Sequence, residues 1–341
     1  MHATTTTERL SRIYKSIGLL AATCVLIALM LSSVRFGLKT YSWDQIITSF
    51  NPSDKPTNES IIIQTVRIPR ALIAALVGGS LAVAGALMQA MTRNPLASPS
   101  IFGINSGAAF AIVIAISFFN VSGLSQFTWI AFLGAAVSAT LVYALGSLGR
   151  DGLTPMKITL AGAAMTAFFA SLTQGILLGN GKAFEQVLYW LVGSVEGRTM
   201  AMLQSVYPYM LLAWIGAIVL SPHINVLSMG DDIAKGLGQQ TVYIKVITAI
   251  IIVILAGGSV AVAGPIVFVG LMIPHIVRFL VGIDYRWVIP YCAVLGGILL
   301  VSADIGARFI IMPKEVHVGV MTAILGVPFF IYIARKGGLL K

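Results

Sequence analysis

The sequence predicts an all-α membrane protein, a single polytopic bundle of about ten transmembrane helices that spans residues 1–341. Three observations lead to this fold class. First, 57% of the residues are hydrophobic and only 10% are charged, whereas about a quarter of a soluble domain is charged. Second, the apolar residues gather in runs near the roughly 20 residues that a helix needs to cross a bilayer. Third, the chain has 34 glycines, and small residues let membrane helices approach closely.

Ten apolar stretches define the expected helices, and the short connections between them favour a compact bundle of tilted helices. They cover residues 17–36, 69–91, 101–118, 127–148, 157–178, 205–221, 242–263, 266–281, 287–306 and 318–334. The pairs Gly103/Gly107 and Gly175/Gly179 have the small-xxx-small spacing that brings two helix backbones together. We therefore expect a helix contact at each of these two pairs.

The basic residues predict that both chain termini are cytoplasmic. The net charge of +10 fits the enrichment of Lys and Arg in cytoplasmic loops and gives no reason to expect a nucleic-acid partner. No small-x-small cleavage site follows the first apolar run, which favours a permanent helix after a short cytoplasmic tail, residues 1–16, over a cleaved signal peptide. This topology places 13 basic residues inside and 9 outside. Because that bias is weak, we expect some outer arginines to have a role of their own.

Motifs for catalysis, nucleotide binding or metal binding are missing from the sequence. Residues 179–182 lack the first glycine of a phosphate-binding loop, and Ala183 stands where Ser or Thr would bind magnesium. The four histidines and two cysteines have no metal-ligand spacing. These gaps argue against a membrane-embedded enzyme, and they mean that any ATP must be hydrolysed by another chain.

Carboxylates are also scarce inside the predicted spans. Only Asp304 falls clearly within one, and Arg308 follows it at the i+4 position, which predicts an intrahelical ion pair. Ion-coupled carriers bury carboxylates along their path because the coupling ion needs a ligand there. An ion-coupled secondary transporter is therefore the alternative class, and this scarcity counts against it.

Three groups of motifs, in one order along the chain, are shared with a known family. They are RIPR at 67–70 with GALMQA at 85–90 and RNPLASP at 93–99, then GPIVFVGLMIPHIVR at 264–278, then ADIGAR at 303–308 with GVMTAILGVPFF at 319–330. From about residue 60 onward the chain resembles the permease subunits of iron–siderophore and vitamin B12 ABC importers, the FecCD type of type II importer.

The resemblance implies a transport subunit without an ATPase site of its own, in the bacterial cytoplasmic membrane. It implies four kinds of partner: a second permease subunit (a paralogue or an identical copy), two cytoplasmic ATPase subunits that hold ATP and magnesium, an extracytoplasmic substrate-binding protein, and the lipid bilayer. The implied cargo is a ferric siderophore, with the hydroxamate type as one class. Haem, ferric citrate and cobalamin permeases share the motifs and stay open as alternatives. No cofactor is expected on this chain.

The resemblance also assigns roles at both faces of the membrane. Arg67, Arg70 and Arg308 would dock acidic residues of the binding protein, because a guanidinium holds a carboxylate with two hydrogen bonds. Their alternative role is anchoring at the membrane interface, with Arg308 paired to Asp304. On the inner face, an acidic helix start followed by glycines would couple to the ATPase. The coupling residues are Gly230, Asp231, Asp232, Ala234, Lys235, Gly236 and Gly238. The alternative there is an ordinary solvated connector.

By the same resemblance, the fifth, eighth and tenth helices line the passage. The loop before the fifth helix would form the inner gate, with polar positions continuing into that helix. The residues are Leu153, Thr154, Pro155, Thr159 and Thr166. Ser171, Thr173 and Gln174 add polar atoms without charge, which suits a passage that does not hold its cargo tightly. Ser and Thr also form hydrogen bonds between membrane helices, so a purely structural role is the alternative.

Overall fold

The structure is a computed structural model that describes residues 2–51, 57–121, 123–148 and 154–335, and these residues form helices and connecting loops. The helices in chain order are α1 His2–Arg35, α2 Trp43–Thr48, α3 Asn58–Ile62, the π-helical η1 Ile63–Arg67, α4 Ile68–Thr92, the 3-10 helix η2 Pro99–Phe102, α5 Ile104–Phe119, α6 Leu124–Ser147, α7 Pro155–Gly179, α8 Gly181–Leu191, α9 Met200–Ser228, α10 Asp231–Gly236, α11 Thr241–Ala263, α12 Val269–Val281, α13 Tyr285–Ala307 and α14 Val318–Arg335.

Each of the ten predicted spans falls on a helix of the structure. Seven helices are long and apolar enough to cross a membrane, and α5, α12 and α14 are shorter apolar helices. α1 begins at His2, so the segment expected as a tail is helical. The short helices α2, α3 and α8 were not predicted. α2 depends on a local signal, the capping box between Ser42 and Gln45, and not on a long apolar run.

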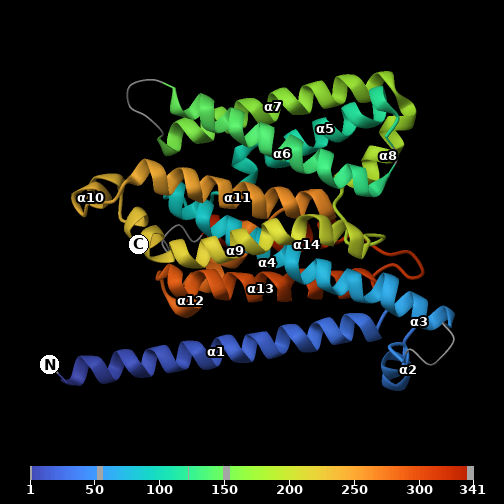
Figure 1. Cartoon of the computed structure of the whole chain (residues 1–341), viewed down its shortest axis with the longest axis horizontal. Coiled ribbons are helices and arrows are strands. Elements are labelled where there is room, and N and C mark those ends of the chain that lie inside the picture. The colour runs from blue at the N-terminus through green and yellow to red at the C-terminus, as the bar shows by residue number, and fades with distance from the viewer. Residues whose placement is uncertain (1, 52–56, 122, 149–153, 336–341) are drawn as a thin grey trace.

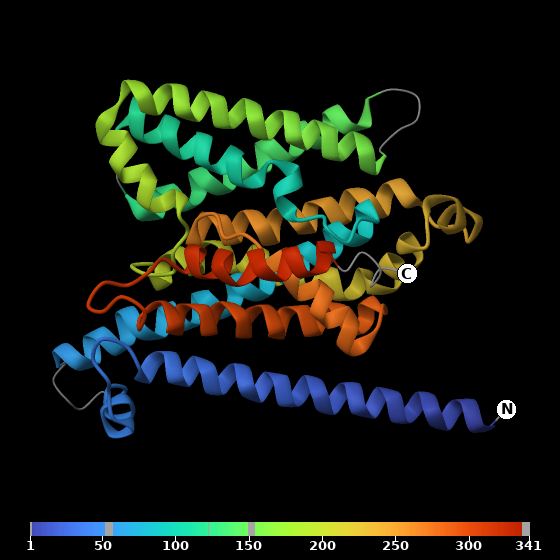
Figure 2. The same ribbon diagram turned by 180° about the vertical axis from the view of Figure 1, so that it is seen from behind.

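The helices lie roughly side by side, with α4 in the centre (Figures 1 and 2). α4 packs against α9, α11, α12 and α13, and the most apolar part of its span is 83% buried. α1 and α7 lie along opposite edges of the bundle, where only 11% and 17% of their most apolar windows are buried. The edge helices therefore present apolar side chains to the surroundings, which is the arrangement expected in lipid.

The bundle has two distinct ends. The N-terminus and α10 lie at one end, which we call the α10 end (left in Figure 1). α2, α3, α8 and the loop 308–317 between α13 and α14 lie at the other, which we call the α2 end. Every long helix connects the two, so a residue's position along its helix determines the end at which it lies.

Glycine lets α4 occupy the crowded centre. A Cβ atom added at Gly85 would lie 1.8 Å from the carbonyl oxygen of Gly270, and one at Gly78 would lie 2.3 Å from that of Gly296. Of the two predicted glycine pairs, Gly103/Gly107 is confirmed as a close contact, since a Cβ at Gly107 would lie 2.6 Å from the carbonyl oxygen of Gly134. The other prediction was wrong for this chain: both members of the pair 175/179 have open space beside them, because α7 lies at the edge.

We predict opposite effects of alanine at two glycines inside helices. Gly85→Ala forces a methyl group against a backbone oxygen and should destabilise the protein by about 1–3 kcal/mol. Gly175→Ala meets no atom within 4 Å, so the better helix propensity of alanine should leave stability unchanged or raise it. The thermal midpoints of the two purified variants in detergent measure this, and equal midpoints would contradict the packing argument.

Candidate functional site

A cluster of buried charges joins α4, α13 and the loop 308–317 at the α2 end. Arg70, in the first turn of α4, donates from Nε and Nη2 to the Asp304 carboxylate at 2.8 to 3.1 Å. Nη1 of the same guanidinium lies 2.6 Å from a carboxylate oxygen of Glu315. Arg308 donates to Oδ2 of Asp304, an oxygen that Nε of Arg70 also contacts, so the expected i,i+4 pair is present. Asp304 and Arg308 are 1% and 0% exposed.

The same cluster holds the C-terminal end of α1. Arg308 donates from Nη1 to the carbonyl oxygens of Ser33 and Phe36 at 2.7 and 2.9 Å. Arg67 donates from Nη1 to Phe36 at 2.8 Å and from Nη2 to the carbonyl of Lys39 at 3.2 Å. The last carbonyls of a helix have no partner within it. Arg308 supplies such a partner at Ser33, and both arginines also bind carbonyls in the segment just past the end of α1. Together they attach this end of α1 to the bundle.

This geometry changes what the three predicted docking arginines can do. All three side chains are buried: Arg67, Arg70 and Arg308 are 9%, 6% and 0% exposed. Their guanidinium groups therefore form contacts within the chain and offer little surface to a partner. Three arginines face two carboxylates, which leaves one positive charge in excess. The two hydrogen bonds of Arg67 described above both go to neutral backbone carbonyls. Docking of a partner at this end stays a prediction. Arg67 is the best candidate of the three, because its described hydrogen bonds do not pair its charge with a carboxylate.

Burial also accounts for the weak inside-positive bias in the sequence. Among basic side chains whose exposure the structure describes, four of seven at the α2 end are buried, against one of nine at the α10 end. The four are Arg67, Arg70, Arg198 and Arg308; the one is Lys245. Counted by exposed charge, the difference between the two ends is therefore large. Most of the described arginines at the α2 end are buried inside the fold. A count of basic residues along the sequence cannot detect this burial.

The predicted helix start at 231 is present as α10. Gly230 has φ of +120° and Gly238 has φ of +79°, backbone conformations that favour glycine, so the two residues delimit this short element. Ala234 anchors it, fully buried, and Asp231 pairs with the buried Lys245 at 2.5 Å. Asp232, Lys235 and Gly236 are exposed. A coupling role for them stays a prediction.

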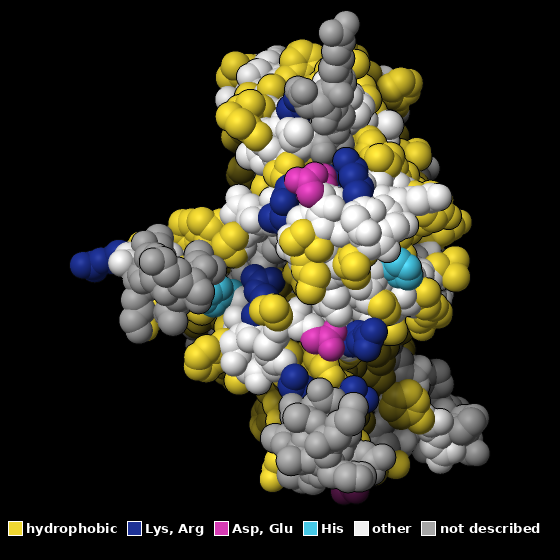
Figure 3. All heavy atoms as spheres, turned by 90° about the vertical axis from the view of Figure 1, so that its left-hand side faces the viewer, with side chains coloured by type: hydrophobic (Ala, Val, Ile, Leu, Met, Phe, Trp, Pro, Cys, Tyr) yellow, Lys and Arg dark blue, Asp and Glu magenta, His cyan; other side chains and the backbone are white. Residues whose placement is uncertain are grey.

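Sequence reasoning missed an apolar row on the surface beside these charges. Met229, Ile233 and Leu237 are 62%, 53% and 67% exposed and recur every four residues. That spacing was the available signal. Figure 3 views the α10 end and shows acidic and basic side chains mixed with hydrophobic ones. A surface of this kind suits contact with another protein.

The predicted gate residues lie at the start of α7 and along it. Leu153 lies outside the described residues. Thr154 caps α7 by accepting a hydrogen bond from the backbone N–H of Lys157 at 3.3 Å, and Pro155 follows as the first helical residue. Thr159 is exposed and donates to the carbonyl of Pro155 in its own helix at 2.9 Å. Thr166 is exposed. The structure gives Thr154 and Pro155 a role in starting α7 and does not test whether any of these residues forms a gate.

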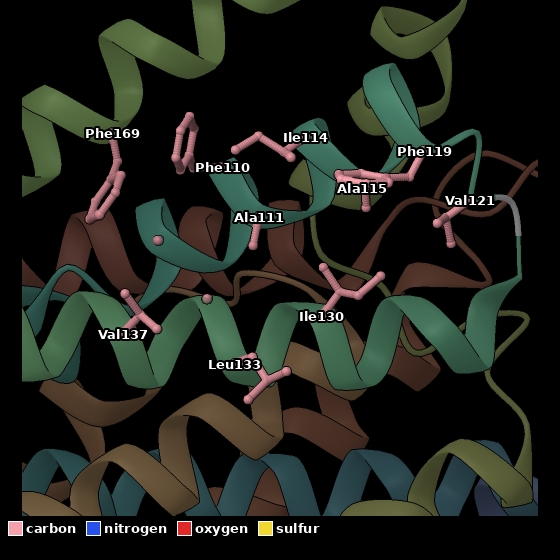
Figure 4. Close-up of a pocket in the computed structure, with 12 residues that line it drawn as sticks. Phe110, Ala111, Ile114, Ala115, Phe119, Val121, Ile130, Leu133, Val137 and Phe169 are labelled. Carbon is pink, nitrogen blue, oxygen red and sulfur yellow. The ribbon is translucent and has the colours of Figure 1, made fainter.

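A groove of about 550 Å³ runs between α5, α6 and α7 (Figure 4). Phe110, Ile114 and Leu133 are among the apolar side chains that line it. Its walls offer hydrocarbon contacts only, so it suits a lipid chain better than a polar cargo. Among the described residues, no three or more His, Cys, Asp or Glu side chains are grouped to hold a metal ion.

Comparisons with known proteins agree over nearly the whole chain. The model of the FecCD transport family matches residues 25–336. The "Probable siderophore transport system permease protein YfiZ" of Bacillus subtilis is 56% identical over 96% of this chain and 98% of its own length. The "Fe(3+)-citrate import system permease protein YfmD" of the same organism is 49% identical over 84% of each chain. Among solved structures, an inward-facing metal-chelate type ABC transporter has a TM-score of 0.82 at 27% identity, covering 94% of this chain and 99% of that one.

We predict that neutralising Asp304 destabilises the protein strongly. Asp304→Asn keeps the shape of the side chain but leaves two buried arginines with one carboxylate fewer, a change of the kind that costs about 3–5 kcal/mol. Glu59→Gln breaks the surface pair with Lys39 and should change the thermal midpoint little, because water screens that pair. If both variants melt at the same temperature, the cluster does not stabilise the fold as argued.

Proposed function

Because the chain belongs to the FecCD transport family, we propose that it is the permease subunit of an ABC importer that carries an iron(III)–siderophore complex across the bacterial cytoplasmic membrane. The observation that carries this proposal is the match of the family over residues 25–336. Seven helices with the length and composition of membrane spans support it. A ferric citrate, haem or cobalamin cargo is the alternative within the family, and the hydroxamate class of siderophore is the finer proposal that we test below.

We propose that the α10 end faces the cytoplasm. Exposed basic side chains gather at that end, whereas most of the described basic side chains at the α2 end are buried. Lys and Arg concentrate on the cytoplasmic side of membrane proteins. This orientation places both termini inside and leaves the α2 end on the outer face.

The α10 segment then provides the contact with a partner ATPase. This short element exposes an apolar row and two charged residues, Asp232 and Lys235. Another protein that binds there would cover both. The pair between Asp231 and Lys245 links that element to α11, so a push on α10 acts on a membrane-spanning helix. In this proposal ATP and magnesium are held by two ATPase subunits, and a second permease, identical or paralogous, completes the passage.

At the outer face, the α2 end would receive a substrate-binding protein. The excess positive charge of the buried cluster favours an acidic group on that partner. Arg67 is the candidate contact because its described hydrogen bonds leave its charge without a paired carboxylate. Arg70 and Arg308 contribute by setting the sign of the local field.

An ion-coupled carrier is a weaker alternative. The acid that lies within a predicted span, Asp304, is 1% exposed and already binds two arginines. A carboxylate held in that way is not free to bind and release a coupling ion. The energy for transport is therefore proposed to come from the partner ATPase.

Reconstitution tests the proposed function. In proteoliposomes with its ATPases and binding protein, the chain should import radiolabelled ferric siderophore only when ATP is present. A variant with Ile233→Asp and Leu237→Asp should lower that uptake about tenfold or more, since it places charge in the apolar contact. Ile310→Asp, which changes a 56% exposed residue at the α2 end, is the control for ATPase binding: the ATPase should still co-purify with this variant and not with the double variant. Uptake that needs no ATPase and collapses with the proton gradient would overturn the proposal.

Docking gives a separate prediction. Arg67→Gln should raise the Kd for the binding protein about tenfold, because a hydrogen bond to a charged group contributes about 1.5–3 kcal/mol. It should also weaken the salt dependence of binding. Arg198→Gln changes another buried arginine at the same end and serves as the control, with an unchanged Kd. The same Kd for wild type and both variants would exclude Arg67 from the interface.

A further inference from the structure

A recess with polar walls lies between α5, α7 and α8, on the opposite face of α5 from the groove of Figure 4. Its volume is about 640 Å³. Among the side chains that the structure describes there, four uncharged polar residues line it, and no acidic, basic or histidine side chain does. The polar residues are Asn105 and Ser106 on α5 and Thr173 and Gln174 on α7. Apolar side chains of α8 and Pro265 close the remaining walls.

Thr173 carries an unsatisfied hydroxyl. Its side chain is 6% exposed, and its Oγ1 has no hydrogen-bond partner among the described residues. Elsewhere in the bundle a helical threonine donates to the carbonyl four residues earlier, as Thr92, Thr140 and Thr248 do at 2.7 to 2.8 Å. A buried hydroxyl without a partner costs about 1–3 kcal/mol. An occupant of the recess that supplies the missing hydrogen bond removes that cost.

The surroundings of Pro265 favour a wet recess over one filled with lipid. Pro265 belongs to the irregular segment 264–268 between α11 and α12, which runs beside α14 in Figure 2. α12 has 13 residues and a length of about 20 Å, which is less than the roughly 30 Å of a hydrocarbon core. Part of the irregular segment therefore lies within the membrane. Backbone of this kind persists there only where protein buries it or where it lines a watery cavity.

We propose that this recess is a contact site for the cargo in transit and that it selects iron chelates with an uncharged organic shell, such as trihydroxamates. This inference rests on the proposed function. The two amides and the Thr173 hydroxyl can each donate and accept, and the Ser106 hydroxyl, which donates to the carbonyl of Gly103, can still accept. These groups match the carbonyl and amide groups on such a shell. A carboxylate-rich chelate such as ferric citrate would need a positive group to offset its loss of water, and the described lining of the recess includes none.

Because the site is uncharged, the contact is weak, and this weakness suits transit. A neutral hydrogen bond contributes about 0.5–1.5 kcal/mol, so losing one should change a transport rate about two- to tenfold. Thr173, whose hydroxyl has no partner among the described residues, is therefore the most informative position to alter. Asn105 and Gln174 flank the same space and would hold the chelate against it.

The first test is Thr173→Val in the full complex with ATPases and binding protein in proteoliposomes. Valine keeps the shape and removes the unpaired hydroxyl, so the thermal midpoint should hold or rise. Uptake of ferrioxamine E, a cyclic iron trihydroxamate without net charge, should fall two- to tenfold. Thr140→Val removes a hydroxyl that already bonds its own helix and should leave uptake unchanged. Equal uptake by the two variants would overturn the inference.

The second test is labelling of Thr173→Cys by a hydrophilic maleimide. Cys24 is exposed, so the experiment uses a Cys24→Ser background, and the other cysteine, Cys292, is buried. Ferrioxamine E should slow labelling, and ferric citrate at the same concentration should not. Equal protection by both chelates, or by neither, would overturn the proposed selectivity.

The wild-type arm separates this inference from the proposed function. If wild type imports no iron chelate with ATP, the proposed function fails and this inference fails with it. If wild type imports the iron complex of a catecholate siderophore but not ferrioxamine E, the proposed function stands and the inference is wrong. If wild type imports ferrioxamine E and Thr173→Val slows it while Thr140→Val does not, both are supported.

Discussion

The sharing of one buried carboxylate, Asp304, by two arginines is the interaction on which the α2 end of this bundle depends. In lipid, no hydrophobic force draws one apolar helix to another, so α1, with only 11% of its apolar window buried, needs specific attachment. Arg308 provides it by bonding both Asp304 and the last carbonyls of α1. At the other end, the hydroxyl of Tyr291 donates to the carbonyl of Lys15 at 2.7 Å. Hydrogen bonds at Lys15 and near the C-terminal end of α1 therefore attach a helix that apolar packing alone would hold weakly.

The centre of the bundle follows a different principle, the close approach of backbones at glycine. α4 passes between its neighbours because Gly78 and Gly85 leave room for carbonyl oxygens of α13 and α12. Small residues give little side-chain volume but allow many backbone contacts. The result is a tight core around α4 and a looser edge at α7, where the polar recess and the apolar groove both lie. These two cavities therefore lie beside the core and not within it.

The two ends of the molecule use charge in opposite ways. The α2 end buries its charges in a network that is nearly but not fully balanced, whereas the α10 end exposes its charges beside an apolar row. Both arrangements are incomplete in a single chain. The α2 end has an excess positive charge without a matching anion, and the α10 end has an apolar row that no other protein covers. A permease that is loaded at one end and driven from the other would have these two requirements.

The sequence by itself determined the fold class, the positions of ten apolar helices, the i,i+4 pair of Asp304 and Arg308, and the start of α10. All of these depend on composition or on residues within about one helical turn, where spacing determines geometry. Only the tertiary structure decided that Arg70, 234 residues from Asp304, shares its carboxylate, and that the pair Gly175/Gly179 faces open space. It also decided that the hydroxyl of Thr173 is buried without a partner. Such contacts depend on how distant helices pack in three dimensions, and no local spacing encodes that packing.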